Sequence, residues 1–199
     1  ARIFFSRETL TLPELKYPKE NRKPFSLITA SRLASEKHVD WICKAVIQAR
    51  SEVPELSLDI YGVGGEREKL ETIIRENNAS DYIHLMGQHD LSEVYQNYEA
   101  YIAGSTSEGF GLTLMEAVGG GLPIIGFDVR YGNPTFIRNG ENGYLIDLPE
   151  EDKDRIEALR KGIVNLFKQD LEKCHSVSYE VAKDFLTSNV QEKWREAVC

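Results

Sequence analysis

The stretch Ser105–Ala117, which reads STSEGFGLTLMEA, carries the strongest signal in this sequence. Gly109 and Gly111 flank an aromatic residue where a strand is expected to lead into a helix. Because these two positions lack side chains, a ligand can approach the backbone and meet the unpaired amides of the first helical turn. Such a helix start favours an anion, typically phosphate.

Two carboxylates lie at the ends of this stretch, Glu108 in the loop and Glu116 in the helix. Glu116 lies roughly a turn and a half inside a helix that starts near Gly111, where a carboxylate suits a vicinal diol better than a phosphate. Taken singly, Glu108 could be a solvated loop acid and Glu116 an acid of the helix surface. An anion site beside two hydroxyl acceptors indicates a nucleotide-linked sugar as ligand.

Around this stretch, short apolar runs alternate with patterns of helical spacing, which predicts an α/β fold with a doubly wound, parallel sheet and right-handed crossovers. Past Leu148 only helical patterns remain, with Phe185 and Trp194 expected to anchor the last two helices. Strands are predicted at 25–30, 56–61, 82–86, 101–103, 122–126 and 144–146. Helices are predicted around 39–49, 70–74, 90–98, 111–119, 156–167, 176–187 and 189–198.

The loops at 31–37, 62–65, 87–89, 104–111 and 127–133 all follow predicted strands. They therefore share the carboxyl edge of the sheet, where ligands bind in such folds. The first of these loops holds Arg32 and Lys37, two cations that could neutralise a diphosphate leaving group as its charge develops. The alternative is that they belong to a solvated basic loop.

Composition excludes several other classes of protein. A formal net charge of -8 without a long basic run argues against a nucleic-acid surface. No apolar segment approaches the roughly 18 residues that span a bilayer. Three cysteines without CxxC spacing argue against a disulfide framework or a zinc site and fit a reducing, cytoplasmic compartment.

Motif searches disfavour the common alternative enzymes. The run Gly62-Val63-Gly64 lacks the third glycine of the dinucleotide pattern, so a nicotinamide enzyme is disfavoured. There is no GxxxxGK[ST] loop and no nucleophile elbow, so a phosphate-loop ATPase and a hydrolase lack support. The four histidines are isolated and have no metal-ligand spacing.

An ordered set of short motifs resembles the C-terminal half of a retaining GT-B glycosyltransferase of group 1, family 4. The set extends from about Phe25 to Asp147 and is specific only as a whole, since each piece alone is weak. It consists of Ser31-Arg32-Leu33 with Lys37, Tyr61-Gly62-Val63-Gly64, Gly87, EGFGLTLME at Glu108–Glu116, and Asn139-Gly140-Glu141-Asn142-Gly143-Tyr144-Leu145. One departure is His38, where the family commonly has glycine.

The resemblance implies a role for each matching position. Arg32 and Lys37 would hold the diphosphate, Glu108 would bind hydroxyls of the donor sugar, and Glu116 would bind the ribose diol. Arg32, Lys37 and Glu108 would be the catalytic residues. The loop glycines Gly62 and Gly109, the amides of Phe110, Gly111, Leu112 and Thr113, and the backbone of Gln88 and His89 beside the base would complete the donor site. No metal or other cofactor is expected.

The family also implies a domain arrangement. Residues 1–24 would be a linker remnant from a missing N-terminal domain, residues 25–175 the Rossmann-like nucleotide-sugar-binding domain, and residues 176–199 helices that cross back. The acceptor would lie mainly on the missing domain, so these 199 residues are expected to bind donor without turnover. The run Asp128–Pro134 resembles a bacterial subgroup that includes poly(glycerol-phosphate) glycosyltransferases and the N-acetylglucosaminyltransferases of serine-rich adhesins.

That subgroup implies a UDP-sugar donor, with UDP-N-acetylglucosamine leading and UDP-glucose as the alternative. The acceptor would be a protein Ser/Thr or a polyol phosphate, and members often work with a partner glycosyltransferase-like subunit. We expect a cytoplasmic protein, with peripheral association at the inner membrane face as a further option. A non-catalytic nucleotide-sugar-binding module and a nucleotide-sugar epimerase stay as alternative functions.

Overall fold

The computed structural model describes residues 11–198, apart from the side chains of Trp194, Ala197 and Val198. The predicted anchor Trp194 and the first ten residues of the predicted linker therefore lie outside the described residues. Six parallel strands form a single sheet in the order β3-β2-β1-β4-β5-β6, which confirms the predicted Rossmann-like architecture. The strands are β1 (Ser26–Ala30), β2 (Ser57–Tyr61), β3 (Ile83–Gly87), β4 (Ala100–Ile102), β5 (Ile124–Phe127) and β6 (Gly143–Ile146).

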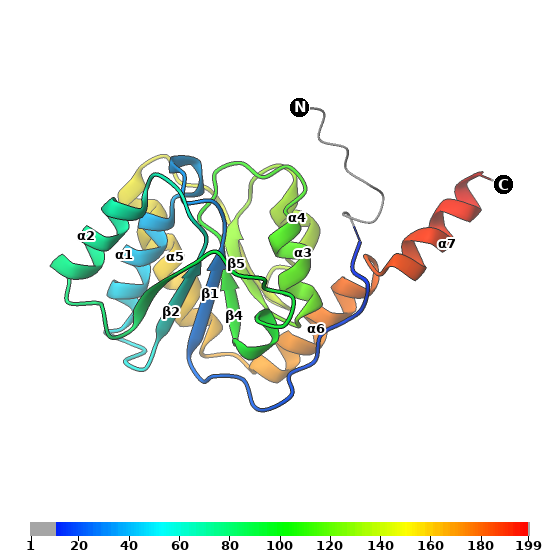
Figure 1. Ribbon diagram of the computed structural model, residues 1–199, viewed down its shortest axis with the longest axis horizontal. Coiled ribbons are helices and arrows are strands. Elements are labelled where there is room, and N and C mark those ends of the chain that lie inside the picture. The colour runs from blue at the N-terminus through cyan, green and yellow to red at the C-terminus, as the bar shows by residue number, and fades with distance from the viewer. Residues whose placement is uncertain (1–10, 199) are drawn as a thin grey trace.

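Helices cover both faces of the sheet, as Figure 1 shows. Leu27 of β1 belongs to the core beneath α1, α2 and α5, while its neighbour Ile28 belongs to the core beneath α3, α4 and α6. Successive side chains of a strand point to opposite faces, so β1 is buried on both faces along its whole length. The helices are α1 (Val39–Ala49), α2 (Arg67–Glu76), α3 (Leu112–Gly119), α4 (Gly132–Phe136), α5 (Asp152–Leu166), α6 (Leu171–Lys183) and α7 (Thr187–Val198).

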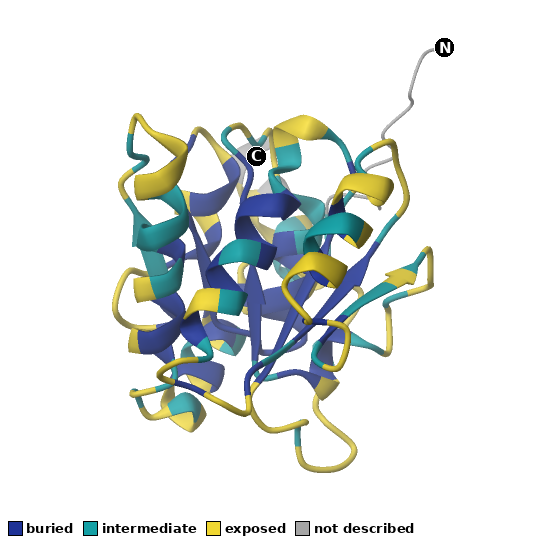
Figure 2. Ribbon diagram, turned by 90° about the vertical axis from the view of Figure 1, so that its left-hand side faces the viewer, coloured by how far each residue is buried: buried dark blue, intermediate teal, exposed yellow. Residues whose placement is uncertain are grey.

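Burial follows these layers. Figure 2 shows strands that are mostly buried and helices whose outer sides are exposed. Both described cysteines, Cys43 and Cys174, are buried free thiols. No helix among residues 11–198 is long and apolar enough to cross a membrane.

Two predicted helices differ from the structure. The helix expected at 90–98 is instead a series of turns that ends in a short 3-10 helix, Tyr95–Asn97. The amides of Val94 and Asn97 bond three residues back, so the wider α-helical turn does not form. The helix expected from 176 begins at Leu171, because the Asp170 side chain accepts a hydrogen bond from the Lys173 amide and caps an earlier start.

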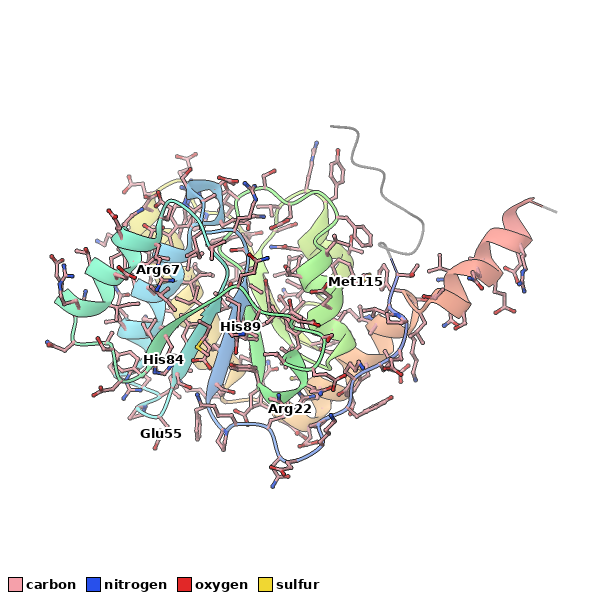
Figure 3. All side chains as sticks on the ribbon, viewed as in Figure 1. Arg22, Glu55, Arg67, His84, His89 and Met115 are labelled. Carbon is pink, nitrogen blue, oxygen red and sulfur yellow. The ribbon has the colours of Figure 1, made fainter. Side chains whose placement is uncertain are left out.

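Residues 11–24 lie against the domain. Leu12 is buried and forms a parallel bridge with Leu186, just before α7. Arg22, labelled in Figure 3, donates to the carbonyl oxygens of Gln96, Tyr98 and Gly120. The division into linker, donor domain and returning helices stays a prediction. Figure 1 shows α7 extending away from the sheet.

Candidate functional site

The crevice at the carboxyl ends of the strands holds the candidate site. The chain moves outward from β1 to β2 and β3 and then returns to the other side of β1 with β4. Loops after β1 and β4 therefore diverge at this point, which is where open α/β sheets bind ligands. Three cavities adjoin there, with volumes of about 510, 320 and 420 Å³.

The cavity of about 510 Å³ contains an ion pair. Lys37 Nζ lies 2.5 Å from Glu108 Oε1, and the two side chains are only 16% and 18% exposed. The Ser105 hydroxyl donates to the same carboxylate oxygen at 2.9 Å. Lys37 and Glu108 come from loops that are 71 residues apart in sequence. The fold therefore places an ion pair, whose two charges compensate each other, at the wall of this cavity.

His38 explains how the loop places Lys37. His38 adopts a left-handed conformation with φ 45° and ψ 43°, between the short 3-10 helix Ser35–Lys37 and α1. Glycine is the residue that reaches this region without steric cost, so the departure at position 38 keeps the backbone shape that a glycine allows. Its ring stacks on Trp41, with centroids 3.5 Å apart and planes tilted by 8°.

The N-terminus of α3 borders the same cavity. Gly111 caps the helix with φ 83°, and its carbonyl oxygen accepts from the amides of Leu114 and Met115. The amides of Leu112 and Thr113 precede these bonds, and both residues line the cavity. The Tyr101 hydroxyl lies 3.1 Å from Thr113 Oγ1 and 2.9 Å from the Ala30 carbonyl oxygen, so it ties this helix start to β1.

Arg32 is a largely exposed charged residue of the crevice. Its side chain is 74% exposed and pairs with Glu36, four residues on, at 2.8 Å. An exposed pair of this kind contributes little to stability. Arg32 lines both the 510 Å³ and the 320 Å³ cavities, so it can turn toward an anion in either at small cost.

The cavity of about 320 Å³ is formed by the loops after β2 and β3. A side chain at Gly62 would overlap the Ser31 carbonyl oxygen, so glycine is required for this loop to pack against β1. His89 Nε2 lies 2.8 Å from the Met86 carbonyl oxygen, and its ring meets Tyr61 edge-on at 5.7 Å. Figure 3 labels His89 near the middle of the molecule. Gln88 and His89 both line this cavity.

Glu116 lines the third cavity, of about 420 Å³. The Tyr95 hydroxyl donates to Glu116 Oε2 at 3.0 Å. Neighbouring atoms desolvate the carboxylate, and this burial raises the pKa of Glu116 although the Tyr95 hydrogen bond lowers it. Leu112 also lines the first cavity and Leu91 the second, so the three cavities adjoin one another.

The structure brings most of the predicted site residues together. Gly109 is the exception, since it lines none of the three cavities and a side chain there would meet nothing within 4 Å. Arg32, Lys37, Gly62, Gln88, His89, Glu108, Phe110, Gly111, Leu112, Thr113 and Glu116 line the crevice. Their roles toward a donor stay predictions.

Sequence reasoning missed Tyr95 and Ser105, the hydrogen-bond donors to the two glutamates. Tyr95 lies in the segment 90–98 that the sequence predicts to be helical, and no motif singles it out. Within residues 11–198, no group of three His, Cys, Asp or Glu side chains is arranged to hold a metal ion. That the site works without a metal stays a prediction.

Comparisons with known proteins agree with this geometry. The family model described as glycosyl transferases group 1 matches residues 14–184. The chain is 54% identical over 189 residues to the UDP-N-acetylglucosamine--peptide N-acetylglucosaminyltransferase GtfA subunit of Streptococcus gordonii, covering 94% of this chain and 37% of that protein. It is 32% identical over 204 residues to the poly(glycerol-phosphate) alpha-glucosyltransferase of Bacillus subtilis, covering 98% and 29%. The chain thus spans about a third of the length of these relatives.

Solved structures give the same result. The pneumococcal O-GlcNAc transferase GtfA in complex with UDP and GlcNAc superposes with a TM-score of 0.90 at 52% identity, over 94% of this chain and 38% of that chain. TarM of S. aureus superposes with a TM-score of 0.78 at 22% identity, over 94% and 38%, and shows the fold alone.

Proposed function

The chain belongs to the glycosyl transferases group 1 family, and on this premise we propose that it is the donor-binding half of a retaining N-acetylglucosaminyltransferase. The observation that carries the proposal is the crevice of adjoining cavities, in which a paired Lys37 and Glu108, the start of α3 and Glu116 follow one another. The cation and the unpaired amides of the helix start suit a diphosphate, and the carboxylate that follows them can accept from a ribose diol. This is the order of these groups in a nucleotide sugar.

The diphosphate would lie between the α3 N-terminus and the two cations Arg32 and Lys37. Negative charge develops on the departing diphosphate as the glycosidic bond to the sugar breaks, and preorganised cations and amides stabilise that charge. Side chains would thus do the work that a metal does elsewhere. Adding a chelator to the donor titration tests this metal independence.

The sugar and the nucleoside would extend to either side of the diphosphate. When the diphosphate offers Lys37 a new anionic partner, Glu108 is released to accept hydrogen bonds from sugar hydroxyls. The ribose would place its diol on Glu116, and the base would lie against the backbone of Gln88 and His89, which line the adjoining cavity with Gly62.

N-acetylglucosamine and a protein Ser/Thr acceptor are favoured because relatives of that activity are 54% identical to this chain. Glucose and a polyol-phosphate acceptor form the second candidate, favoured by the 32% identity to the poly(glycerol-phosphate) alpha-glucosyltransferase. Transfer would need an N-terminal domain for the acceptor, so we expect this chain to bind donor without turnover.

A partner subunit is also part of the proposal. A solved GtfA/B complex contains a chain that is 55% identical to this one over 94% of its length. We propose that the protein to which these residues belong works with a second, related subunit in the same way. Co-purification of the two subunits tests this expectation, and a transferase fully active as a single polypeptide would contradict it.

The test of the donor site is calorimetric titration of this chain with UDP, UDP-N-acetylglucosamine, UDP-glucose and NAD. We expect uridine nucleotides to bind, NAD not to bind, and Glu116→Ala to weaken UDP by about 1–3 kcal/mol, the loss typical of charge-assisted hydrogen bonds. Glu68→Ala, an exposed acid of α2, is the matched control and should leave UDP binding unchanged. Binding that is equal in both variants would remove the ribose role of Glu116.

A further inference from the structure

Tyr95 is a residue of the crevice that neither the motif analysis nor the proposed function uses. Its side chain is buried, 4% exposed, and its ring lies 6.2 Å from that of Tyr101. A Cβ at Gly120 would come within 2.9 Å of the Tyr95 Cβ, so the end of α3 packs directly against this residue. The ring is therefore held in place, and its hydroxyl is a fixed donor.

The partner of this hydroxyl is Glu116, at 3.0 Å through Oε2. An ionised carboxylate has about four acceptor positions, so one hydrogen bond leaves most of its capacity unused. Among the described residues, no hydrogen bond to Glu116 Oε1 is present. Tyr95 and Glu116 line the same cavity of about 420 Å³. Tyr95 thus fixes one oxygen and leaves the other to a ligand in the cavity.

We propose that Tyr95 is a positioning residue that holds the Glu116 carboxylate toward the ribose diol and thereby makes the site select ribonucleotides over deoxyribonucleotides. This inference rests on the proposed function, because it assigns a specificity to the same donor site. Tyr95 acts through Glu116 and does not itself contact the nucleotide.

Selectivity of this kind needs an acceptor side chain that stays in the cavity when the ligand hydroxyl is absent. A site built to bind a hydroxyl rejects the analogue that lacks it, because the polar group of the site is then left unpaired. A glutamate with free rotamers would avoid that cost by turning into solvent. The Tyr95 hydrogen bond, together with the desolvation of Glu116 by its neighbours, keeps the carboxylate in the cavity.

The experiment compares UDP with 2′,3′-dideoxy-UDP, titrated into this chain and into Tyr95→Phe. The wild-type chain should bind UDP at least about tenfold more tightly than the dideoxy analogue, which corresponds to one charge-assisted hydrogen bond or more. Tyr95→Phe should weaken UDP about fivefold to tenfold and leave the dideoxy analogue within about twofold. The ratio of the two affinities is the readout, and a merely structural role would not change it.

Tyr98→Phe is the matched control. It removes a hydroxyl from the next turn that also donates to a carboxylate, Asp59, at 2.6 Å, but Tyr98 lines none of the three cavities. We expect its affinity ratio to equal that of the wild type. In Glu116→Gln, adding Tyr95→Phe should change the ratio no further, because the positioned carboxylate is already absent.

The outcomes distinguish a failure of the Tyr95 role from a failure of the donor site. Equal weakening of both nucleotides in Tyr95→Phe, or weakening of neither, overturns the positioning role while leaving the donor site intact. A wild-type chain that binds UDP and its dideoxy analogue equally overturns the ribose contact of Glu116 and, with it, the role of Tyr95. A wild-type chain that binds no uridine nucleotide overturns the proposed function itself.

Discussion

The two ends of the stretch Glu108–Glu116 hold their carboxylates in different ways. At the loop end, Glu108 is paired with a cation, Lys37, at 2.5 Å. At the helix end, Glu116 receives a hydrogen bond from a neutral hydroxyl, that of Tyr95, and burial raises its pKa. One carboxylate is thus held by charge and the other by a neutral donor.

The difference matters when an anionic ligand arrives. A cation can exchange one anionic partner for another, so a diphosphate competes with Glu108 for Lys37 and sets the carboxylate free. A tyrosine hydroxyl has no comparable attraction to the diphosphate, so Glu116 stays in place. The loop end is therefore expected to rearrange on binding and the helix end to be preorganised, which lowers the cost of binding.

Among the expected effects, removal of the Lys37 cation should weaken UDP binding most. Lys37→Ala deletes a cation of the diphosphate site and leaves the part-buried Glu108 unpaired beside the incoming anion. We expect UDP binding to weaken by about 2–4 kcal/mol, as is typical when one member of a desolvated charge pair is truncated. Calorimetric titration measures it.

The control for Lys37→Ala is Lys44→Ala on α1. Lys44 pairs with Asp40 at 3.5 Å, with its side chain 41% exposed, and lines none of the three cavities. Its loss should not change UDP affinity. A similar loss of affinity in both variants would mean that net charge, and not the pair in the crevice, attracts the nucleotide.

Neutralising Glu108 should separate the diphosphate from the sugar. In Glu108→Gln, Lys37 no longer has an anionic competitor, so UDP should bind as tightly as in the wild type or several-fold more tightly. UDP-N-acetylglucosamine should lose about 1–2 kcal/mol relative to UDP, because its sugar hydroxyls lose a charged acceptor. Parallel titrations with both ligands give the difference. If the sugar nucleotide gains as much as UDP does, Glu108 has no role toward the sugar.

The sequence predicted the sheet well because its signals are local. Apolar runs such as 25–30 and 56–61 are buried on both faces and leave little choice of structure. The helix expected at 90–98 was wrong because the apolar spacing of Leu91, Val94 and Tyr95 fits 3-10 turns packed on a core as well as it fits an α-helix. Periodicity alone cannot separate these cases.

The site was predictable in its residues and not in its contacts. Motif spacing brought Lys37 and Glu108 to the same edge of the sheet, but the ion pair between them depends on tertiary packing. The hydrogen bond from Tyr95 to Glu116 joins residues 21 apart on different elements, and no pattern in either segment encodes it. The residue types and their spacing identify the groups that can bind a ligand, and the fold determines which of these groups contact one another.

Lowering the pH should affect the carboxylate at the helix end, Glu116. Glu116 binds hydroxyls best when ionised, so the preference for UDP over its dideoxy analogue should fall as the pH is lowered. Because burial raises the pKa of Glu116 above its ordinary 4.5, the fall should begin at a higher pH than for an exposed glutamate. Using the ratio of two nucleotides cancels the ionisation of their phosphates, and titrations across the pH range measure it.

Two variants test the origin of this pH dependence. Tyr95→Phe already has most of the ratio removed, so its ratio should change little with pH. Glu116→Gln has no ionisable group and should give a low ratio that does not change with pH. A pH-dependent ratio in Glu116→Gln would assign the titration to another group.

The smallest effect is expected at His38, whose backbone places Lys37 at the loop end. His38→Gly removes the left-handed strain of a non-glycine residue, about 1 kcal/mol, and also the stack on Trp41, worth a similar amount. Its free energy of unfolding should therefore stay within about 0.5 kcal/mol of the wild type. His38→Ala keeps the strain and loses the stack, so it should be about 1 kcal/mol less stable. Urea denaturation separates the two, and equal destabilisation would show that the stack alone, and not the backbone conformation, keeps this loop in shape.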